Sequence, residues 1–280
     1  ERWSKVLMPL LALIMIVLVI RSVTLPGSSA GIKFLFYPDF SKLTVKGFLD
    51  ALGHSFYSLS LGMGIMITYA SYMKKDANLV EATISIAVLD TFVALLAGLA
   101  IFPAVFAMGL DPGEGAGLAF VTLPAAFTHM PFGQIFSAFF FLLVFIAALT
   151  SMMSITQVPL AFLEDRFGFS KKKSLGVIAA VTVLFGTPSV LAFGPLSGFT
   201  IMGMDYFTFL DRLSNNVLLP IASLLGILFI VFKFGVIPST TEFLMGSKHK
   251  NHFLSYLYGL SIRFLAPIAI IIILIRAILA

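Results

Sequence analysis

The sequence has no cysteine, one tryptophan and few charged residues. Without cysteine there can be no disulfides or thiolate metal sites. Only 11% of the residues are charged and 59% are hydrophobic, which excludes an ordinary soluble domain. The sequence also lacks HExxH, GxGD and glycine-rich phosphate-loop motifs. We therefore expect neither an enzyme with catalytic residues nor a nucleotide-driven motor.

The sequence contains long apolar runs without charged residues. Five stretches contain no Asp, Glu, Lys or Arg: 51–73, 91–110, 115–163, 174–204 and 213–232. A helix needs about 20 apolar residues to cross a membrane, and continuous runs favour helices over the alternating pattern of a barrel. We expect an all-α membrane protein, a polytopic helix bundle forming one transmembrane domain over residues 1–280. Its seven predicted spans are 5–24, 45–73, 77–108, 132–163, 172–193, 207–234 and 253–279.

The basic residues predict the orientation of these spans. Eleven of the 18 Lys and Arg lie at the N-terminus or in the connections after the second, fourth and sixth spans. Because cytoplasmic loops are enriched in Lys and Arg, we expect a multi-pass protein of the plasma membrane with its N-terminus in the cytoplasm and its C-terminus outside. Residues 111–131 should form an outer-face loop with short helices. The net charge of +5 then reflects topology, and no nucleic-acid partner is expected.

The second span contains a break. Between Ser58 and Gly64 it holds two serines and two glycines in seven residues, and a glycine costs a helix about 1 kcal/mol relative to alanine. Backbone groups freed inside a bilayer must find other partners. Transporters use such broken helices to present carbonyl groups and helix ends to ions and substrates. The pattern predicts a discontinuous helix and a solute carrier. Prolines 103, 159, 220 and 267 predict further kinks.

Asp90 is a carboxylate inside the otherwise apolar stretch 86–102. An ionisable group within a membrane helix indicates a functional site; the alternative is an interfacial Asp that caps the helix. Ser58 and the pair Thr150–Ser151 offer oxygen atoms that suit a hard cation, although such hydroxyls commonly bond their own helix backbone. By position alone, Asp211 and Asp165 are interfacial charges.

Four segments resemble the neurotransmitter:sodium symporter family, in its bacterial amino-acid branch: SLSLGMGIMITYASYMKK, LDTFVALLAGLAIFPAVFAMG, GLAFVTLPAAF and ALTSMMSITQVPLAFLED. The resemblance covers essentially all 280 residues and corresponds to transmembrane helices 5 to 11. It implies part of the LeuT-type five-plus-five inverted-repeat fold, with a discontinuous helix. It also implies sodium-coupled symport of a neutral, hydrophobic amino acid by alternating access.

The resemblance assigns roles to individual residues. Ser58 and Asp90 match the first sodium site, and the Ala147 carbonyl, Thr150 and Ser151 match the second. The residues matching the substrate pocket are Tyr57 as aromatic lid, with Ser58, Ser60, Met63, Ser151 and Ile155. Asp211 matches the acidic half of an outer gate, and Asp165 that of an inner gate, with Tyr72 near enough to hydrogen-bond it.

Two departures from the family pattern carry further expectations. Chloride-dependent members have Asn where Asp90 stands, and Gln and Ser where this chain has His54 and Ala94. We therefore expect transport without chloride. The family's first helix, which this chain lacks because it corresponds to helices 5 to 11, supplies half of both sodium sites and the basic partners of both gates. The chain is thus expected to be the C-terminal portion of a transporter, such as a gene fragment would encode, and not to transport alone.

Three alternatives remain open. A proton-coupled permease of a related fold would work without sodium. A non-transporting membrane subunit would fit the missing helices. An intramembrane hydrolase would need a reactive serine at Ser58 or Ser151.

Overall fold

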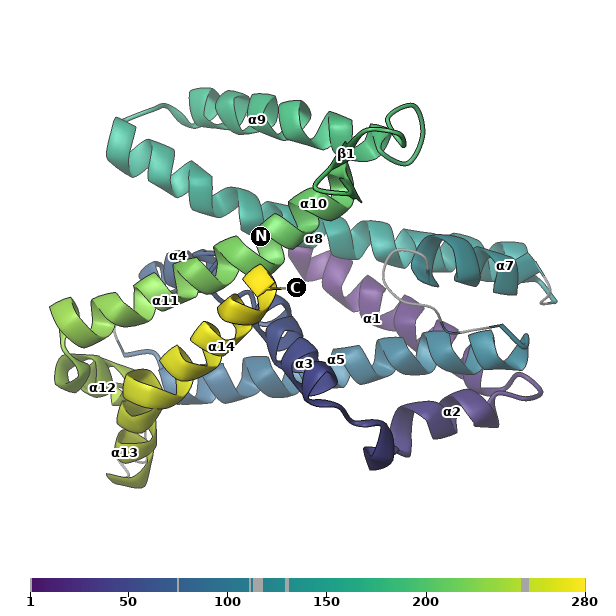
Figure 1. Ribbon diagram of the computed structural model, residues 1–280, viewed down its shortest axis with the longest axis horizontal. Helices are drawn as coiled ribbons and strands as arrows, with labels where there is room; N and C mark the ends of the chain where they lie inside the picture. The colour runs from purple at the N-terminus through teal and green to yellow at the C-terminus, as the bar shows by residue number, and fades with distance from the viewer. Residues whose placement is uncertain are drawn as a thin grey trace. The chain divides into compact units, whose positions relative to one another are not determined.

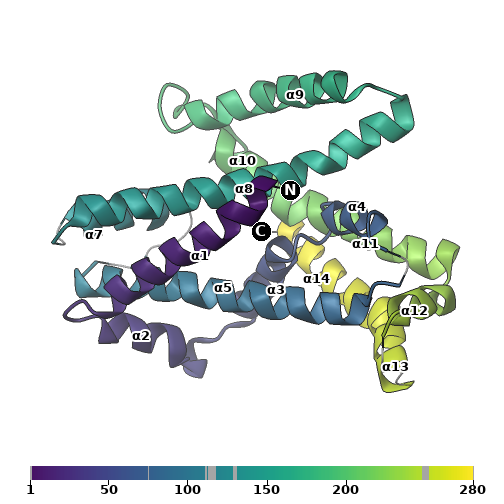
Figure 2. The ribbon, with the colours of Figure 1, turned by 180° about the vertical axis from the view of Figure 1, so that it is seen from behind.

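The computed structural model describes residues 2–74, 76–110, 112, 118–128, 131–247 and 252–279. These residues are almost entirely helical (Figure 1), as the reverse view in Figure 2 also shows. They divide into two compact units, unit 1 with residues 1–43 and 88–153, and unit 2 with residues 44–87 and 154–280. Two long helices, α5 (Leu79–Ala107) and α8 (Gly133–Phe167), contribute residues to both units.

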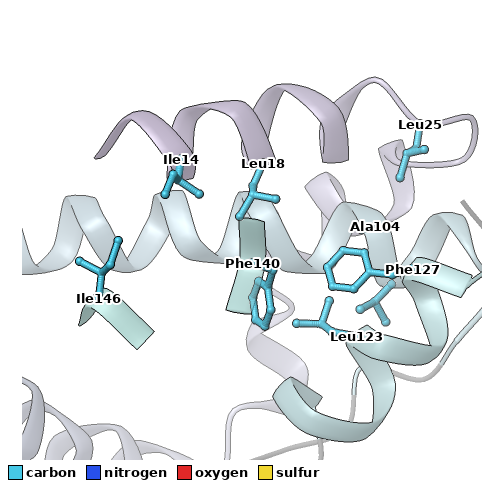
Figure 3. Close-up of a cluster of buried hydrophobic side chains, with 9 residues drawn as sticks. Ile14, Leu18, Leu25, Ala104, Leu123, Phe127, Phe140 and Ile146 are labelled. Carbon is cyan, nitrogen blue, oxygen red and sulfur yellow. The ribbon is translucent and has the colours of Figure 1, made fainter. Parts of the chain in front are cut away.

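Unit 1 has an apolar core. Its elements are α1 (Arg2–Val23), α2 (Ser29–Phe36), the 3-10 turn η1 (Phe40–Lys42), α5 from residue 88, the π-turn η2 (Leu118–Thr122), α7 (Leu123–Thr128) and α8 up to residue 153. Figure 3 shows how side chains from α1, α5, α7 and α8 converge. The buried cluster consists of Ile14, Leu18, Leu25, Ala104, Val105, Leu123, Phe127, Phe140 and Ile146. This core fixes the part of α8 that carries the predicted second sodium site.

The short helix α2 packs directly on the backbone of α5. A Cβ atom at Gly31 would lie 2.5 Å from the Phe102 carbonyl and 2.6 Å from the Pro103 Cα atom. Phe34 covers the same region, with its ring centroid 5.1 Å from that of Phe102 and 5.2 Å from that of Phe106. Only glycine allows two backbones to approach so closely.

Unit 2 contains the broken helix and the C-terminal helices. Its elements are α3 (Val45–Ser58), α4 (Ile65–Ser71), the ends of α5 and α8, α9 (Lys171–Leu191), β1 (Thr200–Ile201), β2 (Met204–Asp205), α10 (Tyr206–Arg212), η3 (Leu213–Leu218), α11 (Leu219–Phe229), η4 (Ile230–Phe234), α12 (Val236–Leu244), α13 (His252–Leu260), η5 (Ser261–Leu265) and α14 (Ala266–Leu279). The two strands form a small antiparallel hairpin, with Thr200 opposite Asp205. Its turn residues Met202 and Gly203 both have positive φ, as a two-residue hairpin turn requires.

Two of the predicted proline kinks lie beside π-helical turns. Pro220 follows η3 and Pro267 follows η5. Proline has no N–H and cannot bond the carbonyl four residues earlier, and a wider turn is one way for a helix to accommodate the missing bond. Pro103 and Pro159 instead lie inside the continuous helices α5 and α8.

Six helices in the described residues are long and apolar enough to cross a membrane: Lys5–Val23, Leu79–Ala107, Gly133–Phe167, Lys171–Leu191, Tyr206–Phe234 and His252–Ala277. They overlap six of the seven predicted spans. The remaining segment, 45–73, consists of α3 and α4 with six residues between them, so the break predicted there is present. That this segment completes a seventh crossing stays a prediction. Of the predicted outer loop 111–131, residues 118–128 are helical, while 111, 113–117, 129 and 130 lie outside the described residues.

Candidate functional site

The break between α3 and α4 begins with a helix-terminating turn. Ser60 has the left-handed φ of 55°. Its N–H donates to the Tyr57 carbonyl at 3.0 Å, and the Leu61 N–H donates to the Phe56 carbonyl at 2.9 Å. This pair of bonds is the Schellman motif, whose left-handed position is usually occupied by glycine. A serine there ends α3 directly after the predicted sodium ligand Ser58.

The segment after Ser60 stays unwound until α4 begins. Gly62 has φ 79°, and Gly64, which caps α4, has φ 76°. Within the described residues, no backbone hydrogen bond reaches the carbonyl oxygens of residues 59 to 63. Unwound carbonyls of this kind are what transporters use as ligands for ions and substrates. Ser58, Ser60 and Met63 are half-buried at this break, and Tyr57 is 49% exposed.

The unwound segment packs against α11. A Cβ atom at Gly62 would lie 2.5 Å from the Leu219 carbonyl oxygen and closer still to Ser223 Oγ. The Ser223 hydroxyl is buried and has no hydrogen-bond partner among the described residues. A buried hydroxyl facing an unwound backbone is a polar group available to the site, and the sequence analysis did not select it.

The second half-helix, α4, is bound to α8 by side chains. The Tyr69 hydroxyl donates to Ser154 Oγ at 2.8 Å, and Gln157 Nε2 donates to the Tyr72 hydroxyl oxygen at 3.1 Å. Gln157 lies six residues after Ser151 on α8, and its polarity within an apolar helix was the only sequence signal that could have identified it. The phenolic proton of Tyr72 stays available for a second acceptor.

The predicted inner gate lies further along α8. Asp165 is exposed and two helical turns beyond Gln157. The hydrogen bond from Tyr72 to Asp165 stays a prediction, as does the placement of Ile155, which is 52% exposed, in the substrate pocket.

Unit 1 brings together two of the oxygens predicted for the second sodium site. Thr150 Oγ1 donates to the Ala147 carbonyl at 2.9 Å. This is the common bond of a helical threonine to its own backbone, and the binding of a cation by these two oxygens stays a prediction. Ser151 follows on the same helix and is exposed.

Asp90 lies half-buried in α5, also in unit 1. It is eleven residues from the helix start at Leu79, or about 17 Å at 1.5 Å per residue. Ser58 belongs to unit 2, and its pairing with Asp90 at the first sodium site stays a prediction.

The described residues contain no group of three or more His, Cys, Asp or Glu side chains that could hold a metal. The predicted sodium ligands are a single carboxylate with hydroxyls and carbonyls, which differs from the ligand sets of transition metals.

The predicted outer gate, Asp211, lies in α10 just before the π-turn η3. Asn215 Nδ2 donates to its Oδ1 atom at 2.7 Å, which fixes the carboxylate.

A second aspartate, Asp205, caps the start of α10. Its carboxylate accepts hydrogen bonds from the Thr208 side chain at 2.6 Å and from the Thr208 N–H at 3.0 Å. The Thr208 hydroxyl holds the pKa of Asp205 below its usual range.

A cleft of about 400 Å³ in unit 2 lies apart from these residues. Its walls come from the start of α5, the end of α12 and α13, through Asn78, Val80, Glu81, Ile84, Ser85, Ser247 and Leu254. None of the predicted sodium, substrate or gate residues lines it.

A bundle of long apolar helices with one unwound helix, whose free carbonyls adjoin hydroxyl groups, is the architecture of a secondary transporter. The model of the sodium:neurotransmitter symporter family matches residues 2–280, and the chain belongs to this family. It is therefore a multi-pass membrane protein of a sodium-dependent transporter family.

Individual relatives agree with this result. The chain is 40% identical over 273 residues to an uncharacterised sodium-dependent transporter of Bacillus subtilis (strain 168), covering 98% of this chain and 60% of the relative. It is 35% identical over 274 residues to an uncharacterised sodium-dependent transporter of Haemophilus influenzae, covering 98% and 59%. The chain thus spans about 60% of the length of these curated relatives.

A solved structure is similar over nearly the whole chain. It is that of MhsT in complex with L-phenylalanine, with a TM-score of 0.86 and 41% identity, covering 98% of this chain and 62% of that one. This match confirms the predicted fold class, a polytopic bundle of the LeuT type with a discontinuous helix. The predicted family membership is confirmed as well.

Proposed function

We propose that residues 1–280 form the C-terminal portion of a sodium-coupled symporter that moves a neutral, hydrophobic amino acid across the plasma membrane by alternating access. The observation that carries this proposal is the break between α3 and α4. Three left-handed residues, Ser60, Gly62 and Gly64, leave backbone carbonyls without intrahelical partners. In a bilayer such carbonyls need other polar partners, and a sodium ion and an amino-acid substrate supply them.

Two sodium ions are expected, each bound partly by this chain. Asp90 and Ser58 would bind the first, and the Ala147 carbonyl with Thr150 and Ser151 would bind the second. Thr150 Oγ1 and the Ala147 oxygen lie 2.9 Å apart, close enough for one cation to contact both. The remaining ligands would come from the helices that precede these residues in the family.

Coupling would follow from charge. An unneutralised carboxylate within a membrane helix is costly, so Asp90 favours a bound cation. A sodium ion beside Asp90 would also attract the carboxylate of an amino acid, because the ion lies between two negative groups. Each ligand would therefore increase the affinity for the other, a reciprocal effect that any such coupling must show.

The substrate class follows from the pocket. The residues that match its lining include Met63 and Ile155, with Tyr57 as a lid, and they suit an apolar side chain. The similar MhsT structure holds L-phenylalanine. A neutral, hydrophobic amino acid is the substrate that fits both observations.

Uptake into proteoliposomes tests this proposal. The protein should be a version extended upstream through the four helices that the family places before these residues, hereafter the extended chain. We expect amino-acid uptake driven by a sodium gradient and not by a proton gradient alone. Asp90→Ala should abolish sodium-driven uptake, whereas Asp39→Asn, which changes an exposed carboxylate in the connection after α2, should not. Uptake driven by protons without sodium would show instead a proton-coupled permease, and unchanged sodium dependence in Asp90→Ala would refute the role of Asp90.

A further inference from the structure

Arg276 of α14 holds the first turns of α3 through two contacts. Its Nη2 atom lies 2.6 Å from Asp50 Oδ1, and its Nη1 atom donates to the Lys46 carbonyl at 3.0 Å. The two partners are one helical turn apart on α3. A single guanidinium thus binds a side chain and the backbone of the same helix end, across more than 220 residues of sequence.

This ion pair differs from an ordinary surface pair. A second ion pair joins Lys42 and Asp39 at 3.6 Å, within a single turn, and both side chains are well exposed. Such local pairs contribute little to stability. The Arg276 side chain is 24% exposed and the Asp50 side chain 59%, so the difference lies in the arginine, whose planar fork makes two directed bonds and adds geometric specificity.

The pair lies at the end of α3 opposite the break. Asp50 precedes Ser58 by eight residues, or about 12 Å along the axis. If α3 tilts about the unwound segment, the far end moves most, and a tilt of roughly 15° would displace Asp50 by about 3 Å. A contact of 2.6 Å does not survive such a displacement. The pair therefore distinguishes one orientation of α3 from others.

The helices α3 and α14 also pack against each other nearby, since a Cβ atom at Gly53 would lie 3.9 Å from Ile273 Cγ2. In the part of the chain that the structure describes, the ion pair between α14 and α3 joins Arg276 and Asp50. This contact restrains α3, which carries Tyr57 and Ser58 at its other end.

We propose that Arg276 is a positioning residue that latches α3 in one orientation and so biases the equilibrium between transporter conformations. A ligand or contact shifts such an equilibrium only if it interacts differently with the two states, and the latch does so because a tilt breaks it. The link to transport rests on the proposed function, whereas the restraint on α3 does not.

A double-mutant cycle in the extended chain tests the link to transport. Asp50→Asn and Arg276→Gln should each change the affinity of sodium-dependent amino-acid binding by about two- to fivefold, in the same direction. The double variant should change it no further, because both substitutions remove one interaction. The charge-reversed pair, Asp50→Arg with Arg276→Asp, should restore much of the original affinity. Asp39→Asn, which removes the local Lys42 pair, should leave it unchanged. Additive effects of the two single substitutions, or none, would overturn the proposal.

A distance measurement tests the restraint itself. Residues 1–280 contain no cysteine, so Val45→Cys on α3 and Tyr256→Cys on α13, both exposed positions, can carry spin labels in this part of the protein. We expect Asp50→Asn to broaden or shift the distance distribution between the labels. An unchanged distribution would contradict the latch even if binding is altered. If the parent protein shows no sodium-dependent binding, the proposed function fails, and this measurement still decides whether Arg276 restrains α3.

Discussion

The Tyr69 hydroxyl donates a hydrogen bond of 2.8 Å to Ser154 Oγ, which ties the half-helix α4 to α8. Gln157, one turn further along α8, makes the second contact by donating to Tyr72. The other half-helix, α3, is held by Arg276 of α14. The two halves of the broken helix thus have different anchors, α8 for α4 and α14 for α3.

We expect Tyr69→Phe to lower the thermal stability of the extended chain. A hydrogen bond between two neutral side chains contributes about 1 kcal/mol, which corresponds to a melting temperature lower by roughly 2–4 °C. The matched control is Tyr37→Phe, because the Tyr37 side chain is 72% exposed and should tolerate the change. Melting followed by differential scanning fluorimetry compares the two variants, and an equal effect of both would contradict the role of the α4–α8 contact.

Gly62→Ala should be far more damaging than Gly176→Ala. The new methyl group would meet the Leu219 carbonyl oxygen and Ser223 Oγ, and the left-handed φ of 79° adds strain for any L-residue. We expect a loss of about 2 kcal/mol or more together with loss of substrate binding. Gly176→Ala in α9 meets no atom within 4 Å and should be neutral or stabilising. Thermal melting and binding of both variants check this, and a folded, binding-competent Gly62→Ala would refute the close packing.

The long helices and the break were predictable from the sequence, because charge-free runs and a Ser- and Gly-rich interruption are local signals. The short helices α2 and α12 and the π-turns before Pro220 and Pro267 were not predicted. In an apolar chain both lipid-facing and buried positions are hydrophobic, so periodicity does not reveal which face packs. The helix α2 is stabilised by the contact of Gly31 with the α5 backbone, a tertiary effect that no local pattern encodes.

The candidate site was predictable only in part, for a similar reason. Asp90 stands out because a carboxylate is rare within an apolar run, and the family resemblance selected the hydroxyls of Ser58, Thr150 and Ser151. Ser223 and Gln157 carry no such signal, since single polar residues are common in membrane helices. Their importance depends on what they face, namely Gly62 and Tyr72.

Chloride should not be required for transport. In the proposed first sodium site, Asp90 would supply the fixed negative charge that in chloride-dependent members comes from the bound anion. Replacing chloride by gluconate at constant sodium concentration should leave the initial rate of uptake by the extended chain unchanged. A drop in that rate, reversed by returning chloride, would show that the carboxylate does not substitute for the anion.

The orientation of the chain can be tested with introduced cysteines. Phe40→Cys lies in the connection predicted to face outward and Lys172→Cys in one predicted to face the cytoplasm; both positions are exposed. A membrane-impermeant maleimide added to intact cells should label position 40 and not 172, and both should react after the membrane is opened. The reverse pattern in intact cells would invert the topology inferred from the basic residues.

Equilibrium binding of a radiolabelled hydrophobic amino acid such as phenylalanine to the purified extended chain, with sodium and with potassium in its place, tests the central claim most directly. We expect saturable binding in sodium that falls at least tenfold in potassium. Equal binding in both salts would contradict sodium coupling through Asp90 and the unwound segment between α3 and α4.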